Sequence, residues 1–288
     1  MSAQAQVADR RFQHYTGERR GAAYSFTALL LHSIGWVLGL KRSSRYKIIP
    51  AVVLLSTYLP AAGFAIIVTI APPGTPLPTY SDFYSVTLPA IYVFVALTMP
   101  ELICPDRRHG TLRMYMTSNL NPVTYLAAKV IAAWSVLAIV TVIPVVIMLL
   151  SYSLFGHGPS NVGDWFKTLA QIVGAGLELA IFYGTIALAI SSLTDRNSFA
   201  AAGIILTFVL SGAALGILQG PLKAPDWVAL VNVNQLPSEL VLRIYQLNVP
   251  TSSTAARLPT WEVAAAAAGW VIAGLAVLAA RYIDEGRR

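Results

Sequence analysis

Six long apolar stretches constrain the fold of this chain more than any other feature. They occupy residues 48–71, 82–103, 125–154, 169–193, 199–218 and 261–282. A helix needs roughly 20 mainly apolar residues to cross the hydrocarbon core of a bilayer. Only 11% of the 288 residues are charged, whereas about 25% are charged in a soluble domain. The sequence therefore predicts an all-α membrane protein, with six transmembrane helices in one domain over residues 1–288.

A seventh apolar stretch, residues 22–40, is long enough to span the membrane, and the charges around it indicate whether it does. Basic residues flank both of its ends, namely Arg19 and Arg20 before it and Lys41, Arg42, Arg45 and Lys47 after it. If this stretch crossed the membrane, one basic cluster would lie outside, against the positive-inside rule. We therefore favour an amphipathic helix in the membrane interface over a seventh span. Two polar side chains, His32 and Ser33, are expected to lie nearer water. The apolar side chains are expected to face lipid, namely Phe26, Leu29, Leu30, Ile34, Val37 and Leu38.

The distribution of basic residues predicts the orientation. Of the 20 Lys and Arg residues, the predicted outer loops hold only Lys167, Lys223, Arg243 and Arg257. By the positive-inside rule, both termini are then cytoplasmic. Residues 1–47 form a cytoplasmic N-terminus, 48–282 a six-span body and 283–288 a cytoplasmic tail of a multi-pass protein in the inner (plasma) membrane. The net charge of +7 needs no nucleic-acid partner to explain it.

The loop between the fifth and sixth stretches, residues 220–260, is the longest predicted outer loop. It contains the segment LPSELVLRIYQL. Pro237 suits the first turn of a helix, and Leu236, Leu240, Ile244 and Leu247 recur at helical spacing. We expect an external helical segment that lies on or dips into the outer leaflet. It either covers the fold or gates a pathway, and the sequence leaves both roles open.

The sequence carries no motif for chemistry of its own. It contains no P-loop, HExxH, CxxC or GxSxG pattern. We therefore expect no enzyme activity and no cofactor bound by this chain. Cys104 and His109 lie five residues apart, but zinc takes four ligands and the sequence offers no matching partner set. A metal site is not expected.

Glu178 is the one acidic residue well inside an apolar stretch. A carboxyl group in a membrane is costly and marks a transport pathway, a proton site or a bond between helices. A protonated Glu178 bonded to Tyr, Ser or Thr of a neighbouring helix is the structural alternative. An ion- or proton-coupled secondary transporter or channel using Glu178 is the alternative function. Such folds usually show paired broken helices in two halves, and no such pair is visible in the sequence.

The segment after the second stretch predicts a short amphipathic helix over residues 106–117. Asp106 can cap a helix start, and Leu112, Tyr115, Met116 and Leu120 follow at helical spacing. The basic residues Arg107, Arg108 and Arg113 surround this apolar face. An aromatic and aliphatic patch rimmed by Arg is typical of a protein contact.

Residues 100–129, PELICPDRRHGTLRMYMTSNLNPVTYLAAK, resemble the segment that follows the second span in ABC-2 type permeases. The six spans, the preceding amphipathic helix and the long outer loop also resemble this family. The resemblance implies the membrane subunit of a bacterial ABC exporter. Such a subunit pairs with a second permease, identical or homologous, and with two ATPase subunits that hold ATP and Mg²⁺. It moves a hydrophobic or amphipathic substrate, such as a drug, lipid or peptide, out of the cell.

The resemblance also implies which residues meet the ATPase. The helix over 106–117 corresponds to the family's coupling helix, and the interfacial helix over 22–40 corresponds to its connecting helix. The implied ATPase contacts are Asp106, Arg107, Arg108, His109, Gly110, Thr111, Leu112 and Tyr115.

Overall fold

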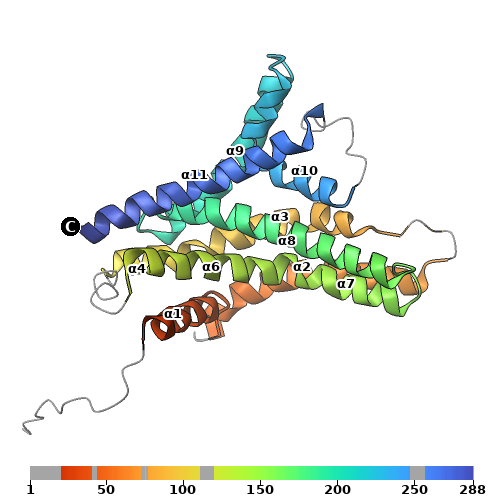
Figure 1. The fold of residues 1–288 in the computed structure, drawn as a ribbon, viewed down its shortest axis with the longest axis horizontal. Coiled ribbons are helices and arrows are strands. Elements are labelled where there is room, and N and C mark those ends of the chain that lie inside the picture. Colours follow the sequence, from red (N-terminus) through yellow and green to blue (C-terminus); the bar gives the residue numbers. More distant parts are fainter. Residues whose placement is uncertain are drawn as a thin grey trace, which may run out of the picture.

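The computed structural model describes residues 21–40, 44–72, 75, 77–110, 120–246 and 257–287. Every regular element in these ranges is helical (Figure 1). The elements are α1 (Ala22–Val37), α2 (Ser44–Ile70), α3 (Tyr80–Thr98), α4 (Pro100–Arg108), α6 (Pro122–Thr141), α7 (Ile143–Leu154), α8 (Val162–Ser191), α9 (Asn197–Gln219), the 3-10 helix η1 (Asp226–Val231), α10 (Gln235–Ile244) and α11 (Thr260–Arg287).

Six helical stretches are long and apolar enough to cross a membrane, and each overlaps one predicted span. They are Pro50–Ile70, Tyr80–Arg108, Pro122–Leu154, Val162–Ser191, Asn197–Gln219 and Thr260–Tyr282. The prediction of six spans is therefore confirmed. The fourth span, predicted to begin at residue 169, begins earlier, since α8 starts at Val162 and has 30 residues. At 1.5 Å per residue it is about 45 Å long, so its charged first turns extend beyond a hydrocarbon core of about 30 Å.

Two of the spans are interrupted next to a proline. The second span breaks into α3 and α4 at Met99, before Pro100, and the third breaks into α6 and α7 at Val142, before Pro144. Proline has no backbone N–H to donate to the preceding turn, so a helix bends or restarts there. The short helix α4 is thereby set off from α3.

Helix α8 lies at the centre of the bundle. It contacts α3, α4, α6, α7, α9, α10 and α11. Small residues let it approach α6 closely: the Oγ1 of Thr141 donates to the carbonyl oxygen of Gly176 at 2.8 Å. By contrast α2, α9 and α11 leave many apolar side chains exposed, as expected for helices that face lipid.

Helix α1 packs against α6, so the predicted orientation of its side chains is wrong. Leu29 and Val37, which were expected to face lipid, are buried in the protein, and Ser33 is buried beside them. His32 is exposed, and Gly35 is buried. Small residues such as Ser33 and Gly35 let helix backbones approach closely, which explains why this face turns inward. With 16 residues, or about 24 Å, α1 is too short to be a seventh span.

Helix α10 runs alongside α8 in the opposite direction. At its start, Tyr183 of α8 donates to the carbonyl oxygen of Asn234 at 3.0 Å, and at its end Gln171 of α8 donates to that of Ile244 at 2.9 Å. Tyr183 lies twelve positions after Gln171, so the start of α10 reaches about 18 Å further along the bundle than its end. The start of α10 therefore lies deeper in the bundle than its end. Leu247, the last residue of the predicted pattern, lies outside the described residues.

Candidate functional site

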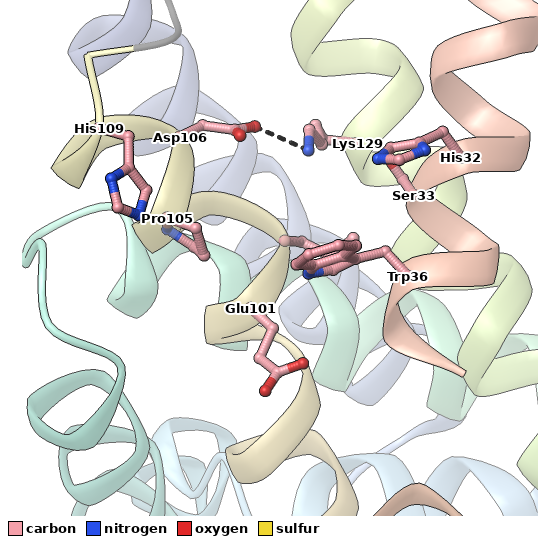
Figure 2. A pocket seen from close by; sticks show the side chains of 9 residues that line it. His32, Ser33, Trp36, Glu101, Pro105, Asp106, His109 and Lys129 are labelled. Carbon is pink, nitrogen blue, oxygen red and sulfur yellow. Dashed lines mark ion pairs between the residues drawn. The ribbon is translucent and has the colours of Figure 1, made fainter. Parts of the chain in front are cut away.

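A polar cavity of about 260 Å³ lies between α1, α4 and α6. The cavity lies at the end of the bundle where α4 and the C-terminal end of α11 are found (Figure 1). We call this end of the bundle the α4 end. The residues that line it are His32, Ser33 and Trp36 of α1, Glu101, Leu102, Pro105, Asp106 and His109 of or just after α4, and Lys129 of α6. Figure 2 shows Trp36 reaching from α1 toward α4, while Asp106 points across to Lys129.

Asp106 joins α4 to α6 through an ion pair and a hydrogen bond. Its Oδ2 lies 2.8 Å from the Nζ of Lys129, and the hydroxyl of Tyr125 donates to the same oxygen at 2.5 Å. The side chains of Lys129 and Asp106 are only 7% and 18% exposed. The ring of Tyr125 lies 5.9 Å from that of Tyr282 on α11. This buried ion pair therefore joins α4 to α6 and adjoins α11.

Arg107 joins α4 to the turn between α8 and α9 through a hydrogen bond and an ion pair. Its guanidinium donates to the carbonyl oxygen of Ser192, and its Nε lies 3.3 Å from the Oδ1 of Asp195. Cys104, fully buried, adds a contact of 3.5 Å from its Sγ to the carbonyl oxygen of Ser191. Because Asp106 and Arg107 are adjacent in sequence, consecutive side chains bind α4 to two different parts of the bundle.

Asp106 does not begin a helix, so the predicted start of the segment 106–117 is wrong. Asp106 lies in the last turn of α4, and its side chain binds Lys129 and Tyr125. The apolar face of the second span continues beyond Pro100, which keeps the chain helical up to Arg108. The helix ends at Arg108, and two residues later Gly110 has a φ of +64°, a left-handed conformation that glycine adopts without strain.

The predicted ATPase contacts fall into three groups. Asp106 and Arg107 bind other parts of the same chain, as described above. Arg108, His109 and Gly110 are exposed at the end of α4. The remaining members of the set, Thr111, Leu112 and Tyr115, lie outside the described residues.

Cys104 and His109 do not form a joint site. Cys104 is buried against the end of α8, whereas His109 is exposed at the end of α4. Over the described ranges, the side chains of His, Cys, Asp and Glu form no group of three or more that could hold a metal ion.

Glu178 lies near the middle of α8, with both carboxyl oxygens shielded from solvent. Neither oxygen has a hydrogen-bond partner among the described residues, so the interhelix bond considered from the sequence is not found there. Glu178 is close enough to the hydroxyls of Tyr84 and Tyr183 to interact with both electrostatically. A buried carboxyl without a direct partner is the feature expected of a site that awaits a ligand or a proton.

A second polar cluster, which the sequence analysis missed, holds the start of α10. The hydroxyls of Tyr92 and Tyr183 lie 3.2 Å apart and donate to the carbonyl oxygen of Asn234 at 3.2 and 3.0 Å. Tyr92 also donates to the side-chain oxygen of Asn234. The ring of Phe208 packs on both tyrosines, at 4.9 and 5.3 Å. Two tyrosines within apolar spans were a usable signal, since a buried phenol seeks a hydrogen-bond partner.

Six apolar spans, one of which is the central helix α8, with polar clusters between them, define a multi-pass α-helical membrane protein. Residues 46–280 match the model of a family described as ABC-2 family transporter protein, and the chain belongs to this family. It is thus the membrane permease of an ABC transporter, the transport subunit and not the ATPase, and its family implies ABC ATPase partners. The resemblance drawn from residues 100–129 is confirmed. Comparison with curated proteins gives no match.

Proposed function

We propose that this chain is the permease subunit of an ATP-driven exporter of a hydrophobic or amphipathic substrate. Two ATPase subunits hold ATP and Mg²⁺, and a second permease, identical or homologous, completes the complex. We expect the α4 end to face the cytoplasm, because the predicted inner loops and termini hold 16 of the 20 Lys and Arg residues of the sequence. The observation that carries the proposal is the pair of ion pairs that join α4 to its neighbours: a buried one to Lys129 of α6, and one to the exposed Asp195 in the α8–α9 turn.

These ion pairs support a mechanical coupling. The ATPase contacts Arg108, His109 and the segment that follows them, and ATP closes the ATPase pair. The resulting displacement of α4 passes through Asp106 to α6 and through Arg107 to the α8–α9 turn. The spans then tilt and open a path outward, as in other transitions in which packed helices shift as rigid bodies. Asp106 and Arg107 thus transmit the movement and do not themselves contact the ATPase.

The exposed face of α9 supports a partner within the membrane. It presents large apolar side chains, among them Phe199, Leu206, Val209 and Ile217. Lipid or a second permease covers such a face in the membrane. A second permease placed there would lie next to α3, which packs against α9 and carries Tyr92 of the polar cluster at the start of α10.

The test is association with a P-loop ATPase encoded in a neighbouring reading frame. We expect Arg108→Glu with His109→Glu to weaken co-purification of the two proteins by about tenfold or more, which corresponds to about 1.4 kcal/mol. Both side chains are exposed, so the membrane body should fold normally. Lys167→Glu, at the opposite end of the bundle and also exposed, is the matched control. Equal association of all variants would contradict the docking site.

The unpartnered carboxyl of Glu178 favours a second candidate function, an ion- or proton-coupled transporter or channel. In that case transport in vesicles would proceed without any ATPase and would follow an imposed proton or ion gradient. Glu178→Gln would abolish it. Transport that requires ATP and ignores the gradient would exclude this candidate.

A further inference from the structure

A second cavity, of about 310 Å³, lies between α3, α8 and α10. Its surface is mainly apolar, although four of the eight lining residues carry a hydroxyl group; the lining includes Ser81, Tyr84, Leu88, Leu179, Ser238 and Val241. This volume is at the lower end of the range of about 300–1,000 Å³ for pockets that hold drug-sized ligands. No residue lining the cavity is charged. The cavity therefore suits an apolar body that carries few polar groups.

Glu178 is close to this cavity but is not one of the residues that line it. It precedes Leu179 on α8, and it lies within electrostatic range of Tyr84; both of these residues line the cavity. Glu178 is sixteen positions from Val162, or about 24 Å along the helix, so it lies at the depth of the hydrocarbon core. A carboxylate at such a depth is costly unless a cation or hydrogen-bond donors compensate it. Within the described residues, neither of its oxygens has such a partner.

Aromatic groups surround the same region. The ring of Tyr245, just after α10, lies 6.5 Å from that of Tyr84. The hydroxyl of Tyr245 is shielded from solvent. Burial raises the pKa of Tyr245, and the neighbouring hydroxyl of Tyr84 lowers it in part. Tyrosine rings and a carboxylate together are the chemistry that recognises organic cations.

From this arrangement we infer that the cavity and Glu178 form a binding site for an amphiphilic cation, an ammonium or phosphonium group attached to an apolar body. The apolar body occupies the cavity, and the positive charge lies at Glu178, on the side of the cavity that Tyr84 lines. A buried carboxyl without a compensating charge takes up a proton, so only a cation stabilises the ionised form of Glu178, and a neutral or anionic ligand does not. This inference rests on the proposed function, since it names the substrate class of the exporter.

The experiment measures binding of radiolabelled tetraphenylphosphonium to the full-length chain in lipid nanodiscs, without ATPase or ATP. Retention by empty nanodiscs is subtracted. We expect saturable binding by the wild-type chain. Glu178→Gln should weaken it at least tenfold, and Glu178→Asp, which keeps a carboxyl group, should weaken it less. Asp164→Asn, which removes an exposed carboxylate from the first turn of the same helix, should change nothing. Triphenylphosphine oxide, a neutral compound of similar shape, should not compete with the cation.

Ser238→Phe supplies an independent variant, because it fills the cavity from α10 without changing any charge. We expect it to weaken binding as Glu178→Gln does. It also keeps the test decisive if Glu178→Gln does not fold.

Several results would overturn the inference. These are retention no greater than that of empty nanodiscs, equal binding by wild type and Glu178→Gln, and equal competition by the neutral compound. The proposed function fails separately, by the ATPase co-purification described above. If the ATPase associates but the cation does not bind, only the substrate class is wrong. If the cation binds but no ATPase associates, the coupling to ATP is wrong and the site remains.

Discussion

The ion pair between Asp106 and Lys129 gives the sharpest test of how α4 is held. Asp106→Asn keeps an amide oxygen that can accept from Tyr125 but removes the charge that lies 2.8 Å from the ammonium of Lys129. Removing one partner of a buried pair costs about 3–5 kcal/mol, since it leaves an uncompensated buried charge. Asp106 is 18% exposed, so water reaches part of the site. We therefore expect the lower end of that range, about 3 kcal/mol.

Thermal unfolding of the purified chain in detergent measures this loss. One kcal/mol shifts Tm by about 2–4 °C in chains of 150–250 residues, so Tm should fall by about 6–12 °C. Lys129→Met should have a smaller effect, because the Asp106 that remains is more exposed than Lys129 and still accepts from Tyr125. The double variant leaves no buried charge at this place. We expect it to be more stable than Asp106→Asn alone, with a coupling energy of about 1–3 kcal/mol.

Two outcomes would refute this reasoning. A change in Tm below about 2 °C for Asp106→Asn would correspond to less than about 1 kcal/mol and would show that the pair contributes no more than a surface ion pair. Strict additivity in the double variant would show that the two side chains do not interact. Asp164→Asn, with its carboxylate exposed at the start of α8, is the control for the loss of a negative charge.

Two further variants test the packing of α8. Gly176→Ala would place its Cβ 2.5 Å from the Cγ2 of Val142, so we expect a loss of about 1–3 kcal/mol from overpacking; Gly174→Ala, with nothing within 4 Å, should not destabilise the protein in the same melting assay. Tyr183→Phe removes one of the two hydroxyls that bind the carbonyl oxygen of Asn234, which should cost about 1 kcal/mol and speed hydrogen exchange in η1 and α10; unchanged exchange there would show that the hydroxyl does not hold the segment.

The six spans could be predicted from the sequence because hydrophobicity alone decides which helices enter a membrane. The ends of the spans could not. Asp164 and Lys167 lie in the first turns of α8, where a helix can carry charge because it has already left the hydrocarbon core. Similarly, the sequence predicts that the second span ends next to Cys104, Pro105 and Asp106. The helix nevertheless continues to Arg108. Local charge marks the edge of the apolar region and does not mark the end of the helix.

The polar sites were harder to predict because their partners are distant in sequence. Asp106 reads as a helix cap from its neighbours alone, but its partner Lys129 lies 23 positions later on another helix. Asn234 is held by Tyr92, which precedes it by 142 positions. Glu178 stood out because a single carboxyl in an apolar stretch needs no partner to be noticed. Its lack of a direct hydrogen bond in the described parts of the chain is visible only in the structure.

Helix α8 connects the two ends of the proposed mechanism. Arg107 binds the turn that follows α8, and Leu179 of the same helix lines the cavity next to Glu178. These two points on α8 are about 18 Å apart, since twelve residues separate Leu179 from Ser191 at the helix end. A close-packed helix moves as a rigid body, so a displacement of its end by α4 must also move the wall of the cavity. We expect the bend at Met99 to let α4 move relative to α3, which forms the facing wall of the cavity. In the proposed mechanism, movement at the α4 end shifts α8 against α3 and thereby changes the shape of the cavity.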